Sequence, residues 1–359
     1  MIGSQLVVAP ARVPTVSVVV PCYRYGHFLA ECVGSVLDRQ DGVHVKVLII
    51  DDASPDDSAE RARDLAAADD RIEVRVHTTN EGHLATYNEG LVWAEGDYTV
   101  LLSADDMLTP GALTRATTVM EAHEEVGFVY GRPVHVPDGQ ARPEQRRWRG
   151  KYSLWSGDEW LRKRFRTGNG CITSPEVVVR TSLQHQLGGY DVGLPHTGDL
   201  EMWLRFAAHA PVAYLRGADQ AYYRVHAQSM SRTTFPDHLA DLTQRSRAYE
   251  TVLRDQADVL SDGDALANSV RRALAREAIW RASRAYDRRR TGQVPIDELV
   301  AFAFDVFPAA QRLPEYAGLQ LRQKIGPTVM PFLQPLVLTA PARRIREWLW
   351  WERWKRRGT

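Results

Sequence analysis

The chain has 359 residues, of which 44% are hydrophobic and 25% are charged, a composition typical of a globular protein with one large domain and an appendage. Its 45 Lys and Arg residues balance its 45 Asp and Glu residues, so no overall field attracts it to nucleic acid, and we expect no nucleic-acid partner. The three cysteines fit neither a zinc cluster nor a disulfide framework, which favours a reducing, cytoplasmic location.

The first segment, 1–14, lacks the basic start and apolar run of a secretory signal, and we interpret it as an N-terminal tail. From residue 15 to about 130, short β-branched runs alternate with helix-length segments. Strands are predicted at 17–20, 45–50, 72–76, 98–102 and 127–130. Helices are predicted at 28–38, 57–68, 83–94 and 110–121. This alternation predicts an α/β fold, a mostly parallel central sheet with helices on both faces.

The second half of the chain has a different character. Residues 133–235 are less regular, apart from a helical pattern at 199–209. Beyond Pro236, long Arg- and Ala-rich segments predict helices at 237–260 and 264–290. We therefore predict an α/β domain over 15–236 and an α-helical C-terminal region over 237–340.

The last segment, 341–359, combines tryptophan with arginine. Four tryptophans lie within it, and such a pattern is typical of a peripheral contact with a membrane interface. The alternative is a helix that packs on its own domain or on a second subunit, because the apolar residues do not share one face. The apolar stretch 325–342 contains four prolines, which argues against a membrane span.

Acidic pairs follow two of the predicted strands. Asp51 and Asp52 end the second strand, and Asp105 and Asp106 follow the fourth. Ligands of parallel sheets bind beyond the carboxyl ends of the strands, and acids gathered there favour a divalent cation, Mn²⁺ or Mg²⁺. The alternative is ordinary turn chemistry.

Seven fragments, in this order along the chain, resemble the family 2 glycosyltransferases. They are VSVVVPCY at 16–23, IIDDAS at 49–54, NEGHLATYNEG at 80–90, LLSADD at 101–106, GGYD at 188–191, DLEMWLR at 199–205 and YRVHAQS at 223–229. The resemblance implies a GT-A fold, a nucleotide-diphosphate sugar donor, a divalent metal and inversion at the anomeric carbon. It assigns donor binding to Pro21, Tyr23, Asp51, Asp52, Asn80, Gly82, Asn88, Ser103, Ala104 and Asp105.

The resemblance also implies the reactive groups. Asp199 matches the catalytic base, although a carboxylate at a helix start is also an ordinary cap. Asp105 and His226 match the metal site, with a structural histidine as the alternative for His226. The residues implied near the acceptor or the diphosphate are Asn169, Asp106 and Arg224.

Three positions depart from the family pattern. Ser103 replaces the first acid of the Asp-x-Asp motif, Tyr87 replaces a common basic residue, and Gly198 replaces the acid before Asp199. We expect an inverting glycosyltransferase that acts in the synthesis of cell-surface polysaccharide, glycolipid or natural-product glycosides. Its expected acceptor is a carbohydrate or a lipid-linked molecule. We expect it to act at the inner face of the plasma membrane and to form homo-oligomers. The departures leave open a catalytically inactive sugar-nucleotide-binding subunit.

Overall fold

A computed structural model of the chain describes residues 12–229 and 238–333, together with Leu349, Glu352, Trp354 and Gly358. The predicted boundary at Pro236 and nearly all of the Trp/Arg-rich segment 341–359 lie outside the described residues. The described residues form two compact units, one that holds 12–160 and 171–229 and one that holds 161–170 and 238–333. Each unit is described by itself below.

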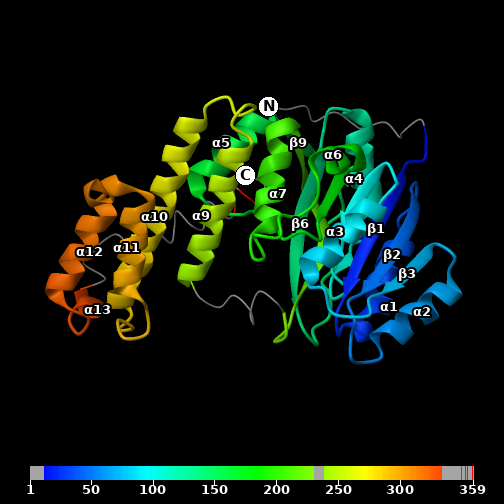
Figure 1. Cartoon of the computed structure of the whole chain (residues 1–359), viewed down its shortest axis with the longest axis horizontal. Coiled ribbons are helices and arrows are strands. Elements are labelled where there is room, and N and C mark those ends of the chain that lie inside the picture. Colours follow the sequence, from blue (N-terminus) through cyan, green and yellow to red (C-terminus); the bar gives the residue numbers. More distant parts are fainter. Residues whose placement is uncertain are drawn as a thin grey trace. The chain divides into compact units, whose positions relative to one another are not determined.

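The first half of the sheet consists of parallel strands, as the sequence predicts. They are β1 (Thr15–Cys22), β2 (His44–Asp51), β3 (Ile72–Val76) and β4 (Tyr98–Leu101), in the spatial order β3-β2-β1-β4 (Figure 1). Their Val- and Ile-rich centres are buried on both faces, which is typical of parallel strands covered by helices. The register pairs Cys22 with Asp51, so the carboxyl ends of β1 and β2 meet at one edge.

The second half of the sheet is mixed. It consists of β5 (Met107–Leu108), β6 (Phe128–Pro137), β7 (Tyr152–Trp155), β8 (Val177–Arg180) and β9 (Val212–Val225), and the order continues β4-β8-β6-β9-β5 with β7 on β9. Strand β8 is antiparallel to both neighbours, whereas β6 and β9 are parallel to each other. The long strand β9 lies in the region that the sequence pattern treats as irregular.

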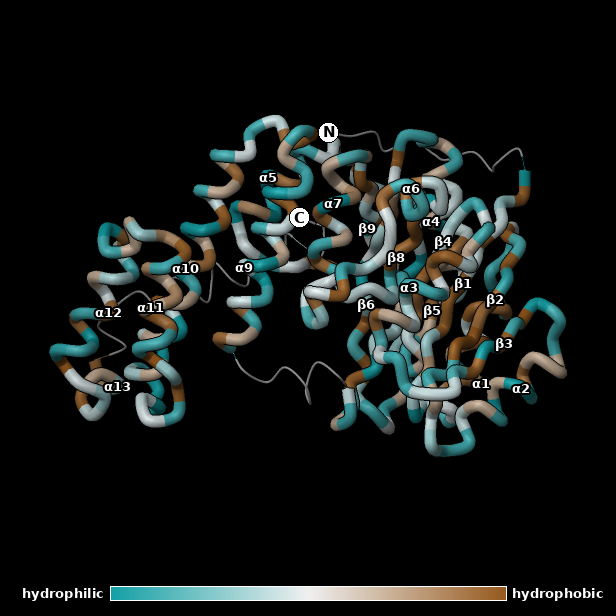
Figure 2. The backbone as a smooth tube through the Cα atoms, in the orientation of Figure 1, coloured by the Kyte–Doolittle hydropathy of each residue, from teal (hydrophilic) through white to brown (hydrophobic). Residues whose placement is uncertain are grey.

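Helices cover both faces of the sheet. The helices of the first unit are α1 (Gly26–Leu37), α2 (Ser58–Ala68), α3 (His83–Trp93), α4 (Ala112–Ala122), α6 (Thr181–Leu187) and α7 (Gly198–His209), and α5 (Gly157–Thr167) joins the two units. Buried residues of α1, α2 and α4 share one core with Val18 and Val20, and Figure 2 shows hydrophobic stretches along β1 and β2. On the other face α3 packs closely on Val19, where a Cβ at Gly90 would lie 2.1 Å from a Val19 methyl carbon.

The predicted helical C-terminal region is confirmed. The second unit contains α9 (His238–Asp255), α10 (Gly263–Asp287), α11 (Ile296–Val306), a 3-10 turn η1 (Pro308–Arg312), α12 (Pro314–Ile325) and α13 (Met330–Leu333). Buried ion pairs crosslink these helices, such as Arg322 with Asp287 at 2.9 Å. Among the described residues, no helix is both long enough and apolar enough to cross a membrane.

Candidate active site

The last residues of β1 lie between the two acidic loops and are bonded to both. The backbone N–H of Asp52 donates to the Cys22 carbonyl at 2.9 Å, and the N–H of Ala104 donates to the Pro21 carbonyl at 3.3 Å. Pro21 and Ala104 are buried, whereas the Tyr23 ring, just after β1, is 41% exposed. These bonds hold the two acidic loops on either side of β1, at the edge that the sequence predicts as the ligand site.

Asp52 organises the loop after β3. Its carboxylate accepts the backbone N–H groups of Glu81 at 2.8 Å and Gly82 at 3.0 Å. The Asn80 side chain donates to the Asp52 carbonyl at 3.0 Å, so Asn80 and Gly82 are placed by the same residue. Asp52 is 4% exposed. Its carboxylate therefore acts inside the protein, and the loop that it holds, rather than its own oxygens, faces outward.

His77 completes the Asp52 network. Its Nδ1 lies 2.8 Å from the Asp52 carboxylate and its Nε2 lies 2.7 Å from Glu89. Burial lowers the pKa of His77, but the hydrogen bonds to Asp52 and Glu89 outweigh it, so the pKa is raised overall. Nothing in the sequence pattern marks this histidine, because its partners lie on β2 and α3.

Asp51 differs from its neighbour. One carboxylate oxygen accepts the Ser54 N–H at 3.0 Å. The other oxygen, Oδ1, is buried and has no hydrogen-bond partner among the described residues. A buried acceptor without a donor is costly, so this oxygen is suited to a ligand N–H or O–H at the strand end.

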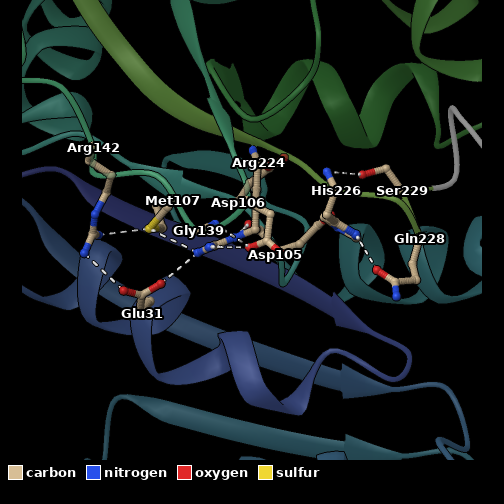
Figure 3. A network of polar contacts seen from close by, with 11 residues as sticks. Glu31, Asp105, Asp106, Met107, Gly139, Arg142, Arg224, His226, Gln228 and Ser229 are labelled. Atoms are coloured by element: carbon tan, nitrogen blue, oxygen red, sulfur yellow. Dashed lines mark hydrogen bonds and ion pairs between the residues drawn. The ribbon is translucent and has the colours of Figure 1, made fainter.

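Asp105 and His226 meet, as the resemblance implies. His226 Nε2 lies 3.0 Å from Asp105 Oδ2, although 121 residues separate them along the chain (Figure 3). The hydrogen bond to Asp105 raises the pKa of His226 more than burial lowers it. Both side chains are largely buried, at 13% exposure for Asp105 and 2% for His226. The pair supplies one carboxylate and one imidazole to a single point.

Arg224 and Asp106 are engaged within the protein. The Arg224 guanidinium donates to the Asp105 carbonyl at 2.9 Å and to Glu31 at 2.7 Å (Figure 3). It also lies 4.2 Å from the centre of the Phe28 ring. Asp106 is 3% exposed, and its carboxyl accepts the Arg224 N–H at 2.9 Å. Burial, followed by the charge of Asp105, raises the pKa of Asp106 well above its usual range. Both residues fasten the end of β9 to the β4 loop.

The two acidic pairs do not converge on one cation. Strand β1 lies between β2 and β4, and two strand spacings amount to about 10 Å. The partners of Asp52 all belong to its own side of the edge, namely His77, Glu81 and Gly82. The expectation that both acidic pairs gather around one metal is therefore corrected. Asp105 and His226 form one cluster, and Asp52 belongs to a separate one with His77.

Asp199 is the second residue of α7. Its Oδ1 accepts the Leu200 N–H at 2.7 Å. Burial raises the pKa of Asp199 to about 6, although the Leu200 hydrogen bond and the charge of His196 oppose the shift. A carboxylate with that pKa is charged at neutral pH yet basic enough to take a proton from a hydroxyl.

Tyr87 lies within electrostatic range of Asp105 and Asp199. Its ring makes an edge-on contact with Tyr190 at 5.4 Å. Burial raises the pKa of Tyr87, and the charges of Asp105 and Asp199 add to the shift. Two of the three departures from the family pattern, Tyr87 and Ser103, thus bring uncharged hydroxyl side chains near Asp105.

Asn88 and Asn169 have internal partners. The Asn88 amide donates to the Tyr190 carbonyl at 3.0 Å and accepts the Tyr190 N–H at 2.7 Å. A Cβ at Gly189 would lie 2.1 Å from the Asn88 amide oxygen, so this close approach requires glycine. Asn169 belongs to the second unit, where its amide oxygen accepts from Arg245 at 2.7 Å. Both amides hold backbone or side chains in place.

Sequence reasoning missed Ser174 and Glu176. Ser174 and Glu176 both lie within electrostatic range of Asp199. Glu176 is 1% exposed and accepts both the N–H and the hydroxyl of Thr173 at 2.8 Å. Burial raises the pKa of Glu176 to about 7. The segment carries no motif, and only the fold brings it to α7.

The sheet, parallel in its first half and mixed in its second, with helices on both faces, is of the GT-A type, as its likeness to the solved structures reported below shows. Residues 17–181, a little under half of the chain, match the family described as Glycosyl transferase family 2. Over these residues, which include both acidic loops, the chain is similar to that family.

Three similar proteins illustrate the extent of the likeness. The GalNAc(5)-diNAcBac-PP-undecaprenol beta-1,3-glucosyltransferase of Campylobacter jejuni is 30% identical over 132 residues, which are 36% of this chain and 42% of that protein. The structure of S. aureus TarS 1-349 in complex with UDP has a TM-score of 0.60 at 14% identity and covers 91% of this chain and 93% of that chain. The mannosyltransferase PcManGT from Pyrobaculum calidifontis, in complex with GDP-Man and Mn²⁺, has a TM-score of 0.51 at 18% identity and covers 92% and 91%.

The likeness to the curated proteins concerns only part of their length. The matched part spans 32% and 31% of two other curated relatives, about a third of each. At identities below a fifth, the solved structures show the fold.

Proposed function

We propose that this protein transfers a sugar from a nucleotide diphosphate onto an acceptor hydroxyl, with inversion at the anomeric carbon. The observation that carries the proposal is the Asp199 carboxylate at the start of α7, whose pKa burial raises to about 6, together with the separate pair of Asp105 and His226, 3.0 Å apart. Inversion needs one base on the acceptor hydroxyl and a separate means of neutralising the departing diphosphate. The site offers both at different residues.

The donor nucleotide is proposed to lie along the strand ends. The exposed Tyr23 ring offers a stacking surface, and the unpartnered oxygen of Asp51 offers an acceptor for the base or the ribose. Gly82 begins α3 with a positive φ of 88°, so the loop that Asp52 holds places Asn80 at the same edge. Ser103 and Ala104 follow on the β4 side. A uridine donor is the first candidate, because TarS was solved with UDP.

The residues present fit a divalent metal. Asp105 and His226 supply an oxygen and a nitrogen ligand, a set that suits Mn²⁺ better than Mg²⁺, and diphosphate oxygens would complete the coordination. Among the described residues, no group of three or more acidic, histidine or cysteine side chains is arranged to hold an ion alone. When bound, the metal would neutralise charge on the leaving diphosphate. PcManGT was solved with Mn²⁺.

Asp199 is proposed to take the proton of the acceptor hydroxyl. The N–H of Leu200 donates to the carboxylate at 2.7 Å, and burial keeps it basic. The charges of Asp199 and Asp105 both act on the Tyr87 side chain, and the donor sugar is proposed to lie beside it. The acceptor is proposed to be a carbohydrate or a lipid-linked saccharide, since a relative acts on an undecaprenol-linked one. The site of action proposed is the cytoplasmic face of the membrane.

A donor panel tests the proposal. UDP-, dTDP- and GDP-sugars are incubated with the full chain and Mn²⁺, and slow donor hydrolysis is followed. We expect at least one donor to turn over and Asp199→Asn to lower the rate by about 100- to 10,000-fold. Asp297→Asn is the matched control, an exposed acid in the first turn of α11. Nucleotide-induced thermal stabilisation without turnover of any donor would instead support the inactive binding subunit.

A further inference from the structure

The carboxyl ends of two helices meet at one end of the second unit. Arg276 of α10 pairs with Glu315 in the first turn of α12, with 2.6 Å between the charged atoms. Further along both helices, Asp287 at the end of α10 pairs with Arg322 at 2.9 Å. The two helices are therefore parallel, and their carboxyl ends lie together. Figure 1 shows the turn after α10 and the short helix α13 at this same end of the unit.

Basic side chains gather at this end. The three consecutive arginines at 288–290 follow the last residue of α10, and all three are exposed. Lys324, in the last turn of α12, is exposed as well. No carboxylate of the described residues forms an ion pair with any of these four cations. The exposed acids in the first turn of α11, Asp297 and Glu298, leave the cations in excess.

Exposed apolar side chains lie beside these cations. Phe332 of α13 is 71% exposed, and Val329, which precedes α13, is 48% exposed. The Arg289 guanidinium lies 5.0 Å from the centre of the Phe332 ring and donates to the Thr328 carbonyl at 3.3 Å. The end of α10 and the start of α13 are therefore neighbours. We name the group the helix-end surface, and it consists of 288–290, Lys324, 328–329 and Phe332.

This combination of apolar and basic groups suits the surface of an anionic bilayer. A phenylalanine ring leaves water when it enters the interfacial layer, and neighbouring guanidinium groups then reach lipid phosphates. An exposed aromatic ring among unpaired cations is the charge complement of an anionic headgroup layer. The chain continues beyond Leu333 toward the Trp/Arg-rich segment 341–359, whose composition predicts a membrane contact by itself. That segment lies almost entirely outside the described residues and is not part of the helix-end surface.

We propose that the helix-end surface docks the protein on membranes that contain anionic lipid. Its two apolar side chains enter the interfacial layer, and its four cations contact headgroup phosphates. The proposal rests on the membrane site of action in the proposed function and identifies a surface that makes the contact. The candidate catalytic residues belong to the first unit, so the helix-end surface can be changed without altering them.

Sedimentation with lipid vesicles tests the surface in the full chain. We expect the protein to bind phosphatidylglycerol vesicles, to bind phosphatidylcholine vesicles much more weakly, and to be released by high salt. The triple variant Arg288→Gln, Arg289→Gln and Arg290→Gln should bind anionic vesicles about 100-fold more weakly, because each arginine near such a surface contributes about fivefold. Phe332→Ser should weaken the binding about tenfold, because it removes the ring that leaves water.

Two control variants carry matched changes on the first unit. Arg39→Gln, Lys46→Gln and Arg63→Gln together remove three exposed cations. Val92→Ala shortens an apolar side chain that is 79% exposed. Both controls should bind anionic vesicles as the wild type does, and thermal unfolding checks that each variant is folded.

The outcomes distinguish the docking surface from the proposed function. Wild-type binding by the triple variant and by Phe332→Ser, or equal binding of the wild type to both kinds of vesicle, would overturn the docking surface. If the triple variant does not fold, Arg288→Gln with Arg290→Gln keeps the contacts of Arg289 and should still weaken binding about 25-fold. Donor hydrolysis measured without vesicles should be unchanged in these variants. A chain that binds anionic vesicles but turns over no donor would contradict the proposed function and leave the docking surface standing.

Discussion

The loops after β2 and β4 present the same chemical elements in different settings. Each has two consecutive acids, and in each one acid pairs with a histidine, Asp52 with His77 at 2.8 Å and Asp105 with His226 at 3.0 Å. In the β2 loop both nitrogens of the histidine meet carboxylates, because Glu89 lies 2.7 Å from Nε2. In the β4 loop the second nitrogen of His226 lies 3.4 Å from the Gln228 amide oxygen, and no carboxylate bonds to it among the described residues.

This difference shows that an acidic pair after a strand does not by itself mark reactive groups. The Asp52 carboxylate already has three hydrogen-bond partners, two backbone N–H groups and the His77 imidazole. Asp105 keeps a more exposed carboxylate and a partner that is less tightly held. We infer that Asp52 and His77 shape the nucleotide-binding edge, and that Asp105 and His226 act on the diphosphate.

The substitution Asp105→Asn should have the largest effect, and it tests the role of the β4 loop. We expect a loss of donor turnover of about 100- to 1000-fold, because a neutral amide is a poor ligand for a divalent metal. The stabilisation that Mn²⁺ adds to the UDP-bound protein should also disappear in a thermal shift assay. Asp64→Asn, at an exposed acid of α2, is the matched control. A metal response that survives in Asp105→Asn would place the metal elsewhere.

Asp52→Asn should act mainly on stability. The amide loses the charge that holds His77 and places one N–H₂ group against backbone donors, at a cost of about 2–3 kcal/mol in the free energy of unfolding. Denaturant unfolding of the full chain measures this cost, and Asp105→Asn should cost less. Equal stability of Asp52→Asn and wild type would mean that the carboxylate is not a structural element.

His226→Gln sharpens the role of the β4 pair. Glutamine keeps an N–H donor for Asp105 but is a poorer metal ligand, so we expect turnover to fall about tenfold while the fold is retained. The concentration of Mn²⁺ that gives half-maximal rate should rise with it. His44→Gln, at an exposed position of β2, is the control. Wild-type metal dependence in His226→Gln would reduce His226 to a structural residue.

The smallest effect concerns the pH dependence of stability through His77. Its pKa in the folded state is raised above the usual 6.5, so its stabilising contribution is complete below that pH and is lost as the pH rises through the folded pKa. His77→Gln removes this contribution. The difference in unfolding free energy from wild type should be about 1 kcal/mol at pH 6 and smaller at pH 9. A difference that grows with pH would reverse the assignment.

The strands and helices of the first half of the fold could be predicted from the sequence, because the pattern of each one lies within a short segment. Val and Ile runs alternate with amphipathic segments, and the strands expected at 72–76 and 98–102 are observed at Ile72–Val76 and Tyr98–Leu101. The second half could not be read in this way. Strand β8 has four residues, and β9 gains its stability from pairing with β6, which lies about eighty residues earlier.

The candidate site divides in the same way. The sequence by itself predicts the candidate reactive groups, Asp105, His226 and Asp199, because their motifs lie at the ends of regular elements. Only the tertiary structure decided that Arg224 and Asn88 serve the scaffold. The physical reason is that a side chain's function depends on which donors and acceptors remain unpaired around it, and those partners come from distant segments that only the folded sheet brings together.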